Sequence, residues 1–219
     1  MERAKNFLKY NPYRFLAVIY LVGIFGHLLA KTRPLMFILT TPVLLITGFI
    51  VLYESVLKKK DNKSLIFILL SALITFCIEV IGVATGSIFG EYVYGSVLGY
   101  KLFGVPIIIS FNWVMVLIGA NSIAHKSSSS FLLRVFITAA LAVLFDYIME
   151  PVAVSFGYWR WSMMPIPIQN YVAWGLTAGV YALCSEYFAK NTISKLAAYY
   201  YFVQFVYFLI LNMISKHIV

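Results

Sequence analysis

Apolar residues run along this chain in long segments that are separated by short polar connections. There are seven such segments, at about 14–30, 34–57, 64–85, 105–124, 131–153, 170–189 and 195–215. A helix needs about 20 mostly apolar residues to cross a bilayer, and each segment comes close to that length. The pattern therefore predicts an all-α integral membrane protein of about seven transmembrane helices, folded as a single polytopic domain over residues 1–219.

Composition supports this prediction and argues against soluble classes of protein. Of the 219 residues 62% are hydrophobic and only 11% are charged, whereas soluble domains have about half and about a quarter. A net charge of +9 would suggest nucleic-acid binding in a soluble protein. Here the Lys and Arg residues stand in short connections beside apolar runs, where they set membrane orientation. We therefore expect the lipid bilayer as a partner and no nucleic acid.

The basic residues are distributed unequally between the two ends of the predicted helices. Of the 17 Lys and Arg residues, five fall at one end and the other twelve at the opposite end; the five are Lys31, Arg33, Lys101, Arg160 and Lys216. The positive-inside rule then predicts a cell-membrane protein with a cytoplasmic N-terminus and an external C-terminus. It also places two longer connections rich in Gly and aromatic residues, about 86–104 and 154–169, on the outer face.

The two aromatic connections and their flanking segments share a spacing. In each, an acid is followed ten residues on by Phe-Gly, and a Pro is followed seven residues on by Trp. The first stretch has Glu79 with Phe89-Gly90 and Pro106 with Trp113, and the second has Asp146 with Phe156-Gly157 and Pro167 with Trp174. This predicts a parallel internal repeat of helices 3–4 and 5–6, with Glu79 and Asp146 at matching depth.

Acidic residues are few, and their positions divide them into two groups. Glu2, Glu54, Asp61 and Glu186 lie at segment ends or in connections, where a solvated role suffices, while Glu79, Glu91, Asp146 and Glu150 do not. A carboxylate in the hydrocarbon zone costs about 2–3 kcal/mol, so it marks either function or a buried ion pair.

Asp146 and Glu150 are four residues apart and share a helix face. One interpretation is a structural ion pair with Arg134, Arg160 or Lys101. The other is catalytic: an apolar site and a second acid favour the protonated form of a carboxyl group, which can then act as a general acid beside a base.

Polar and aromatic residues gather around the same two connections. An interfacial belt explains some of them, but aromatic faces can also line a pocket for a long polyene and stabilise a carbocation. Two of the residues, Asn112 and Asn170, can position a water molecule. The candidate substrate-binding residues are Glu91, Tyr92, Tyr94, Asn112, Trp113, Tyr158, Trp159, Trp161, Asn170, Tyr171 and Trp174.

Several cofactor signatures are missing from the sequence. The three histidines, His27, His125 and His217, are scattered and cannot supply the ligand set of a membrane di-iron enzyme. There is no Gly-rich nucleotide fingerprint, no paired DDxxD and no Cys/His metal spacing. We therefore expect no metal and no cofactor.

The two stretches resemble a known family. The patterns E-x-x-G-x-x-x-G-x-x-F-G-x-Y-x-Y and L-G-x-x-L-x-G-V-P lie between Glu79 and Trp113, and D-x-x-x-E-P, G-Y-W-x-W and N-Y-x-x-W lie between Asp146 and Trp174. Over about residues 79–175 these are similar to the carotenoid 1,2-hydratases of CruF type, which include lycopene, γ-carotene and bisanhydrobacterioruberin hydratases. Glu150 stands where the family pattern has Asp before Pro.

The resemblance implies a cofactor-free addition of water across the terminal C1–C2 double bond of an acyclic (ψ) carotenoid end. It implies a carotenoid and water as substrates, with Asp146 as proton donor and Glu79 and Glu150 as base and orienting partner, although these roles are interchangeable on the sequence alone.

Two other functions fit the same residues. A carotenoid cyclase also protonates a ψ end, but its product has not gained the mass of a water molecule. A small proton-coupled transporter would also have repeats and intramembrane acids. The sequence leaves open which carotenoid reacts, although the basic composition argues mildly against a salt-adapted, bacterioruberin-type source. It also leaves open whether one or both ends react, and the oligomeric state.

Overall fold

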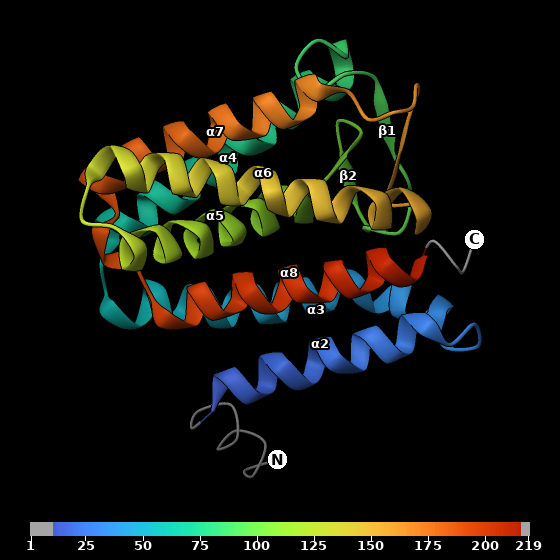
Figure 1. Cartoon of the computed structure of the whole chain (residues 1–219), viewed down its shortest axis with the longest axis horizontal. Helices are drawn as coiled ribbons and strands as arrows, with labels where there is room; N and C mark the ends of the chain where they lie inside the picture. The colour runs from blue at the N-terminus through green and yellow to red at the C-terminus, as the bar shows by residue number, and fades with distance from the viewer. Residues whose placement is uncertain (1–10, 216–219) are drawn as a thin grey trace.

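A computed structural model describes residues 11–215, and seven helices account for most of this region (Figure 1). They are α2 (Pro12–Leu28), α3 (Arg33–Ser55), α4 (Asn62–Thr85), α5 (Ile107–Ser127), α6 (Phe131–Ser155), α7 (Ile168–Phe188) and α8 (Lys195–Ser215), with short 3-10 turns η1 (Leu57–Lys59) and η2 (Lys190–Thr192). Each helix coincides with one of the seven apolar segments. The prediction of an all-α membrane protein is confirmed.

Five of these helical stretches are long and apolar enough to cross a membrane: Arg33–Lys59, Asn62–Thr85, Ile107–Ser127, Phe131–Ser155 and Lys195–Ile214. The α2 helix is apolar but shorter. In the most apolar window of α5, 78% of the residues are buried, against 17% in the Arg33–Lys59 span. The α5 helix is therefore the centre of the bundle, and most of α3 faces outward.

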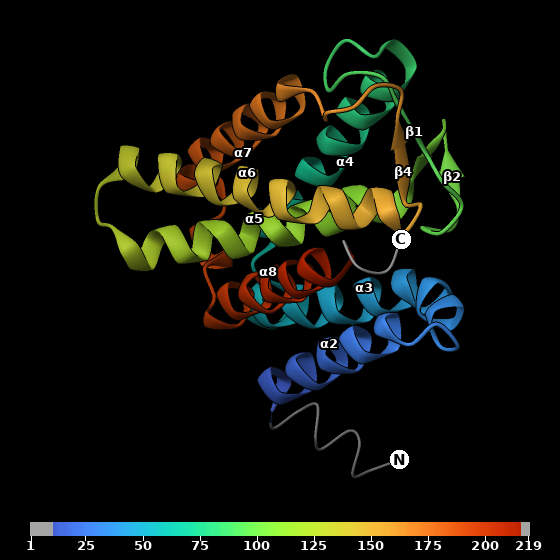
Figure 2. The same cartoon turned by 45° about the vertical axis from the view of Figure 1, so that its right-hand side comes forward.

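The helices pack in two groups around α5, with α2, α3 and α8 on one side and α4, α6 and α7 on the other (Figures 1 and 2). Successive helices run in opposite directions, so the short polar connections at η1, 128–130 and η2 share one end. We call this the basic end. The opposite end, which carries the two aromatic connections, is called the loop end.

Local sequence signals explain where several helices begin and end. Asn11 caps α2 by accepting a hydrogen bond from the backbone N–H of Arg14 at 3.2 Å, and Pro12 follows at the first helical position. Asp61 caps α4 in the same way through Ser64. The α4 helix stops at Gly86, whose left-handed conformation ends a helix at little cost.

The aromatic connections contain four short strands that the sequence pattern did not predict. They are β1 (Tyr92–Tyr94), β2 (Lys101–Leu102), β3 (Val105–Pro106) and β4 (Trp159–Trp161). Strands of two or three residues are too short for an alternating pattern to be recognised. The β2 and β3 strands form a hairpin, whereas β1 pairs with β4 of the other connection.

The β1–β4 pairing relates the two connections symmetrically. The strands are antiparallel with Val93 opposite Arg160, so Tyr92 faces Trp161 and Tyr94 faces Trp159. The internal repeat of helices 3–4 and 5–6 stays a prediction. A side chain at Gly95 would put its Cβ 1.9 Å from the carbonyl oxygen of Gly157. Only glycine allows the two connections to cross this closely.

Candidate functional site

Three buried carboxyl groups line one small cavity at the loop end, which we call the acid cavity. Glu79 comes from α4, and Asp146 and Glu150 come from successive turns of α6; their exposed fractions are 3%, 1% and 2%. The cavity has a volume of about 20 Å³, enough for about one water molecule. Its other lining residues are Tyr92, Tyr94, Trp113, Met149, Trp159, Trp161, Asn170 and Trp174.

Glu79 is held by the two tyrosines of β1. Side chains alternate along a strand, so Tyr92 and Tyr94 point inward while Val93 is exposed. Both hydroxyls donate to Glu79 Oε2, that of Tyr94 at 2.8 Å. Burial, and then the neighbouring Glu79, raise the pKa of each phenol well above its usual value. Both tyrosines therefore keep their protons and act as donors.

Glu150 is held in the same way by the two tryptophans of β4. The indole Nε1–H groups of Trp159 and Trp161 donate to Glu150 Oε2 at 3.0 and 2.9 Å. An indole N–H can only donate a hydrogen bond. In its hydrogen bonding, Glu79 on α4, which is bound by β1, therefore corresponds to Glu150 on α6, which is bound by β4. The sequence spacing had aligned Glu79 with Asp146 instead.

Asp146 has a simpler environment. The amide of Asn170 on α7 donates to Asp146 Oδ2 at 2.6 Å. Each of the three acids thus accepts its bonds on one oxygen. Across residues 11–215 no side chain hydrogen-bonds to the second oxygen of any of them, so these oxygens remain for a proton, a water molecule or one another.

No cation compensates the three acids within the described region. Arg134 binds Glu186 instead, the Lys101 ammonium donates to the backbone oxygen of Tyr94 at 2.5 Å, and Arg160 is exposed on β4. The interpretation of Asp146 and Glu150 as half of an ion pair with these residues is wrong. The donors that face the three acids are all uncharged.

Aromatic rings form the wall of the acid cavity. Trp113 on α5 and Trp174 on α7 stack with centroids 3.7 Å apart and an interplanar angle of 18°. These are the two tryptophans that the Pro-to-Trp spacing predicted to be equivalent. Phe89 also stacks on Trp174, with ring centroids 5.3 Å apart.

A second, larger cavity adjoins the first, and we call it the apolar cavity. It has a volume of about 320 Å³ and lies among α2, α3, α5, α8 and the second connection. Trp113, Met149 and Trp159 line both cavities. Its remaining lining residues are Ile19, Tyr20, Val22, Gly23, His27, Met36, Leu39, Thr40, Val43, Leu44, Leu98, Ile109, Asn112, Tyr158, Tyr207 and Phe208.

The structure brings most of the predicted binding residues to these two cavities. Tyr92, Tyr94, Trp113, Trp159, Trp161, Asn170 and Trp174 line the acid cavity with the three acids. Asn112 and Tyr158 line the apolar cavity instead. Asn112 accepts a hydrogen bond from Gln204 at 3.2 Å, and Tyr158 contacts Thr40 at 3.3 Å.

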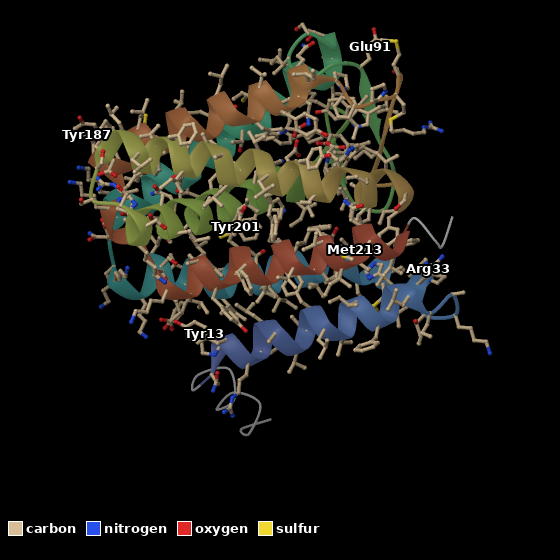
Figure 3. The ribbon with its side chains drawn as sticks, in the orientation of Figure 1. Tyr13, Arg33, Glu91, Tyr187, Tyr201 and Met213 are labelled. Atoms are coloured by element: carbon tan, nitrogen blue, oxygen red, sulfur yellow. The ribbon has the colours of Figure 1, made fainter. Side chains whose placement is uncertain are left out.

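Two predicted binding residues lie away from both cavities. Glu91 precedes Tyr92 in the chain and is exposed at the periphery of the loop end (Figure 3), because side chains next to each other in extended chain point to opposite sides. Tyr171 follows Asn170 on α7 and is therefore turned about 100° around the helix. Its ring packs against the exposed Tyr147, with centroids 5.8 Å apart.

Sequence reasoning also missed residues of the cavities. Met149 lies between the two of them, and nothing in an apolar helix distinguishes this methionine. His27 lines the apolar cavity, with Nδ1 2.7 Å from the carbonyl oxygen of Gly23. An ionisable residue inside an apolar segment was the signal that could have drawn attention to it.

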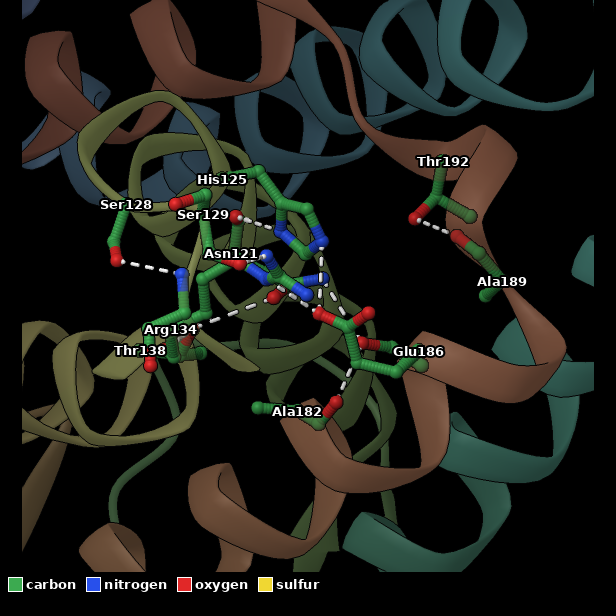
Figure 4. A network of polar contacts seen from close by, with 12 residues as sticks. Asn121, His125, Ser128, Ser129, Arg134, Thr138, Ala182, Glu186, Ala189 and Thr192 are labelled. Carbon is green, nitrogen blue, oxygen red and sulfur yellow. Dashed lines mark hydrogen bonds and ion pairs between the residues drawn. The ribbon is translucent and has the colours of Figure 1, made fainter. Parts of the chain in front are cut away.

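The prediction of solvated roles for the other acids was wrong at Glu186. Glu186 is buried near the basic end, where it accepts from Arg134 Nε at 2.7 Å and lies 3.0 Å from His125 Nε2 (Figure 4). Glu54 is paired with Lys58 at the surface, and Asp61 caps α4. Glu2, Lys216 and His217 lie outside the described residues. In the region that is described, no group of three His, Cys, Asp or Glu residues is arranged to hold a metal ion.

Comparison with known proteins adds a family to this geometry. Residues 40–219, which are 180 of the 219, match the family described as carotenoid biosynthesis protein. The bisanhydrobacterioruberin hydratase of Haloarcula japonica is 29% identical over 141 residues, which cover 58% of this chain and 46% of that relative. The aligned region thus spans about half of the relative's length. No solved structure matches. The resemblance seen in the sequence is confirmed: the chain belongs to the carotenoid biosynthesis protein family.

Proposed function

We propose that this protein is a carotenoid hydratase that adds water across the terminal C1–C2 double bond of an acyclic (ψ) carotenoid end. One observation carries the proposal: three buried acids meet in a single cavity that holds about one water molecule, with uncharged donors around them and an apolar cavity beside them. The family and the name of the relative support the same chemistry.

The first step is protonation of the double bond. The alkene π electrons take a proton from a carboxylic acid to form a C–H bond at C2, which leaves a tertiary cation at C1. Each donor to a carboxyl oxygen stabilises the charged form. Glu79 and Glu150 each receive two donors and Asp146 receives one. Asp146 is therefore the better candidate for the protonated acid.

The cation at C1 is stabilised by the aromatic wall. Indole faces carry negative potential and attract a cation, by about 2 kcal/mol or more where water is excluded. The stacked pair of Trp113 and Trp174 lies beside the three acids in the same cavity. These rings lower the energy of a positive charge without acting as nucleophiles.

Water then captures the cation. Its oxygen lone pair forms the C1–O bond, and the proton that it loses passes to Glu79 or Glu150. Transfer of that proton to Asp146 restores the starting state, so the net reaction consumes one water molecule. A second acid near the first supplies the base that this step requires.

Expression in a lycopene-accumulating host tests the proposal. Wild-type protein is expected to give a more polar pigment heavier by one water molecule. Asp146→Asn and Glu79→Gln, each checked for equal protein level, are expected to give little of it. If both variants still hydrate the pigment, the carboxyl groups are not the catalysts.

The same experiment separates the rival functions. A new pigment of unchanged mass would indicate a cyclase, in which a double bond of the substrate captures the cation. No new pigment at all, together with proton-dependent uptake of a solute by vesicles that contain the protein, would indicate a transporter.

A further inference from the structure

Two residues on the wall of the apolar cavity are exposed at the surface of the bundle, and we place the opening of the cavity between them. Among its lining residues only Val22 on α2 and Leu39 on α3 are exposed, by 57% and 37%. They belong to neighbouring helices that contact each other. Both side chains are apolar, and so is the surrounding surface of α3, where Leu35, Ile38 and Leu45 are also exposed. The opening therefore faces the region where lipid chains lie.

A close contact between α2 and α3 lies between this opening and the loop end. A Cβ at Gly26 would be 2.3 Å from the sulfur of Met36, so the Met36 side chain packs directly against the backbone of α2 at this glycine. Val22 lies about one turn before Gly26 on α2, and Leu39 lies about one turn after Met36 on α3. Both residues therefore lie farther from the loop end than the Gly26–Met36 contact does. A ligand that enters between them comes from the bilayer and not from the water at the loop end.

The size of the apolar cavity limits what it can hold. Pockets of about 300–1,000 Å³ enclose drug-sized ligands. At about 320 Å³ the apolar cavity lies at the lower limit of that range. It has room for one end of a long polyene, and the remainder of the molecule would stay outside, among the lipid chains.

The far side of the apolar cavity adjoins the acid cavity. Trp113, Met149 and Trp159 line both cavities, and Trp159 also donates to Glu150. A chain end that passes from Val22 and Leu39 through the apolar cavity therefore arrives beside the three carboxyl groups.

We infer that Val22 and Leu39 frame a lateral opening between α2 and α3, through which one end of the carotenoid enters the apolar cavity from the bilayer and reaches the acid cavity. This inference rests on the proposed function. It assigns a role to α2, α3 and α8, and it implies that a substrate with two reactive ends must leave and re-enter.

Matched tryptophan substitutions test the opening. Val22→Trp and Leu39→Trp place a large ring at its rim. Val18→Trp and Ile38→Trp place the same ring on the same helices, at exposed positions that line neither cavity. All four are introduced together with Asp146→Asn, so that pigment is bound without being converted. The pigment that co-purifies per protein is measured by its absorbance.

We expect Val22→Trp and Leu39→Trp to lower the retained pigment about tenfold, because a large ring at the rim narrows the opening, and a cost of about 1.4 kcal/mol is enough for such a change. The two controls should stay within about twofold of the parent, as exposed substitutions usually do. With Asp146 restored, the rate of conversion should follow the same order.

The two ideas fail in different ways. If Val22→Trp and Leu39→Trp retain and convert pigment as well as the controls, the opening is elsewhere, even though wild-type hydration stands. If pigment binding depends on these positions but the wild type yields no heavier pigment, the opening stands and the hydration is wrong.

Discussion

Buried acids lie at both ends of this helix bundle, and the two clusters differ in what faces the carboxyl groups. At the basic end, Glu186 lies against Arg134 and His125, and Asn121, Thr138 and Ser185 continue the polar contacts (Figure 4). At the loop end, Glu79, Asp146 and Glu150 meet only hydroxyl, indole and amide donors. Both clusters are buried, and of the two only the cluster at the basic end contains an arginine.

The difference supports a structural role for Glu186 and fits the chemical role proposed for the three acids at the loop end. An acid paired with arginine is locked in its charged form, and its loss strands the arginine. An acid among neutral donors and other acids can hold or release a proton, which a reaction requires. The position of Arg134 produces this difference. It pairs with Glu186 on α7 and not with Asp146 or Glu150, the acids of its own helix α6.

The largest expected effect is a loss of conversion at the loop end. Glu150→Gln should slow pigment hydration by about 10²–10⁴-fold, the usual contribution of a general acid or base. Its carbonyl oxygen can still accept from Trp159 and Trp161, so thermal stability in detergent should change little. The conversion rate is measured as heavier pigment formed per folded protein, and the thermal stability is measured by a melting curve. If Glu150→Gln converted pigment at the wild-type rate, the acids at the loop end would not differ in function from Glu186 in the way proposed.

The opposite result is expected at the basic end. Glu186→Gln should lower the free energy of unfolding by about 3 kcal/mol, because it leaves Arg134 without its counter-ion. Conversion per folded molecule should not change. The exposed pair of Glu54 and Lys58 provides the control, since Glu54→Gln should cost less than about 1 kcal/mol. Replacing both partners with Arg134→Met and Glu186→Leu should recover stability, and failure to do so would mean that the cluster has a further role.

A smaller effect is expected from the donors at the loop end. Hydrogen bonds to charged groups contribute about 1.5–3 kcal/mol each, so Tyr94→Phe, which removes one of the two donors to Glu79, should slow conversion by about 10–100-fold. Tyr100→Phe changes an exposed tyrosine of the same connection and should have no effect. If the variant lacking the hydroxyl that binds Glu79 converts pigment as fast as Tyr100→Phe does, the reaction does not depend on that hydrogen bond.

The smallest effect is expected from a neutral donor at the basic end. Thr138 donates to the backbone oxygen of Arg134 at 2.9 Å and lies 3.4 Å from Asn121 Oδ1. Thr138→Val should lower the free energy of unfolding by about 1 kcal/mol and leave conversion unchanged. A change in rate without a change in melting temperature would link the basic end to the chemistry.

Much of the site could be predicted from local signals. Acids within apolar segments cost free energy, so Glu79, Asp146 and Glu150 were recognisable as functional candidates, and the doubled spacing pointed to Trp113 and Trp174. The sequence did not predict the direction in which two of the candidate side chains point. Glu91 and Tyr171 stand next to cavity residues in the chain, but a strand and a helix turn adjacent side chains to different sides. The orientation in the membrane and the single-domain organisation stay predictions.

Hydropathy and the cost of a buried charge act locally. The helices, the membrane class and the residues able to carry acid chemistry could therefore be inferred from the order of the residues alone. Tertiary structure alone decided which acid meets which partner. The tyrosines and tryptophans reach Glu79 and Glu150 because the two connections pair as β1 and β4. The apolar cavity beside the acids exists because helices from both halves of the chain pack together. Contacts between distant segments depend on the packing of the whole chain, which no local pattern encodes.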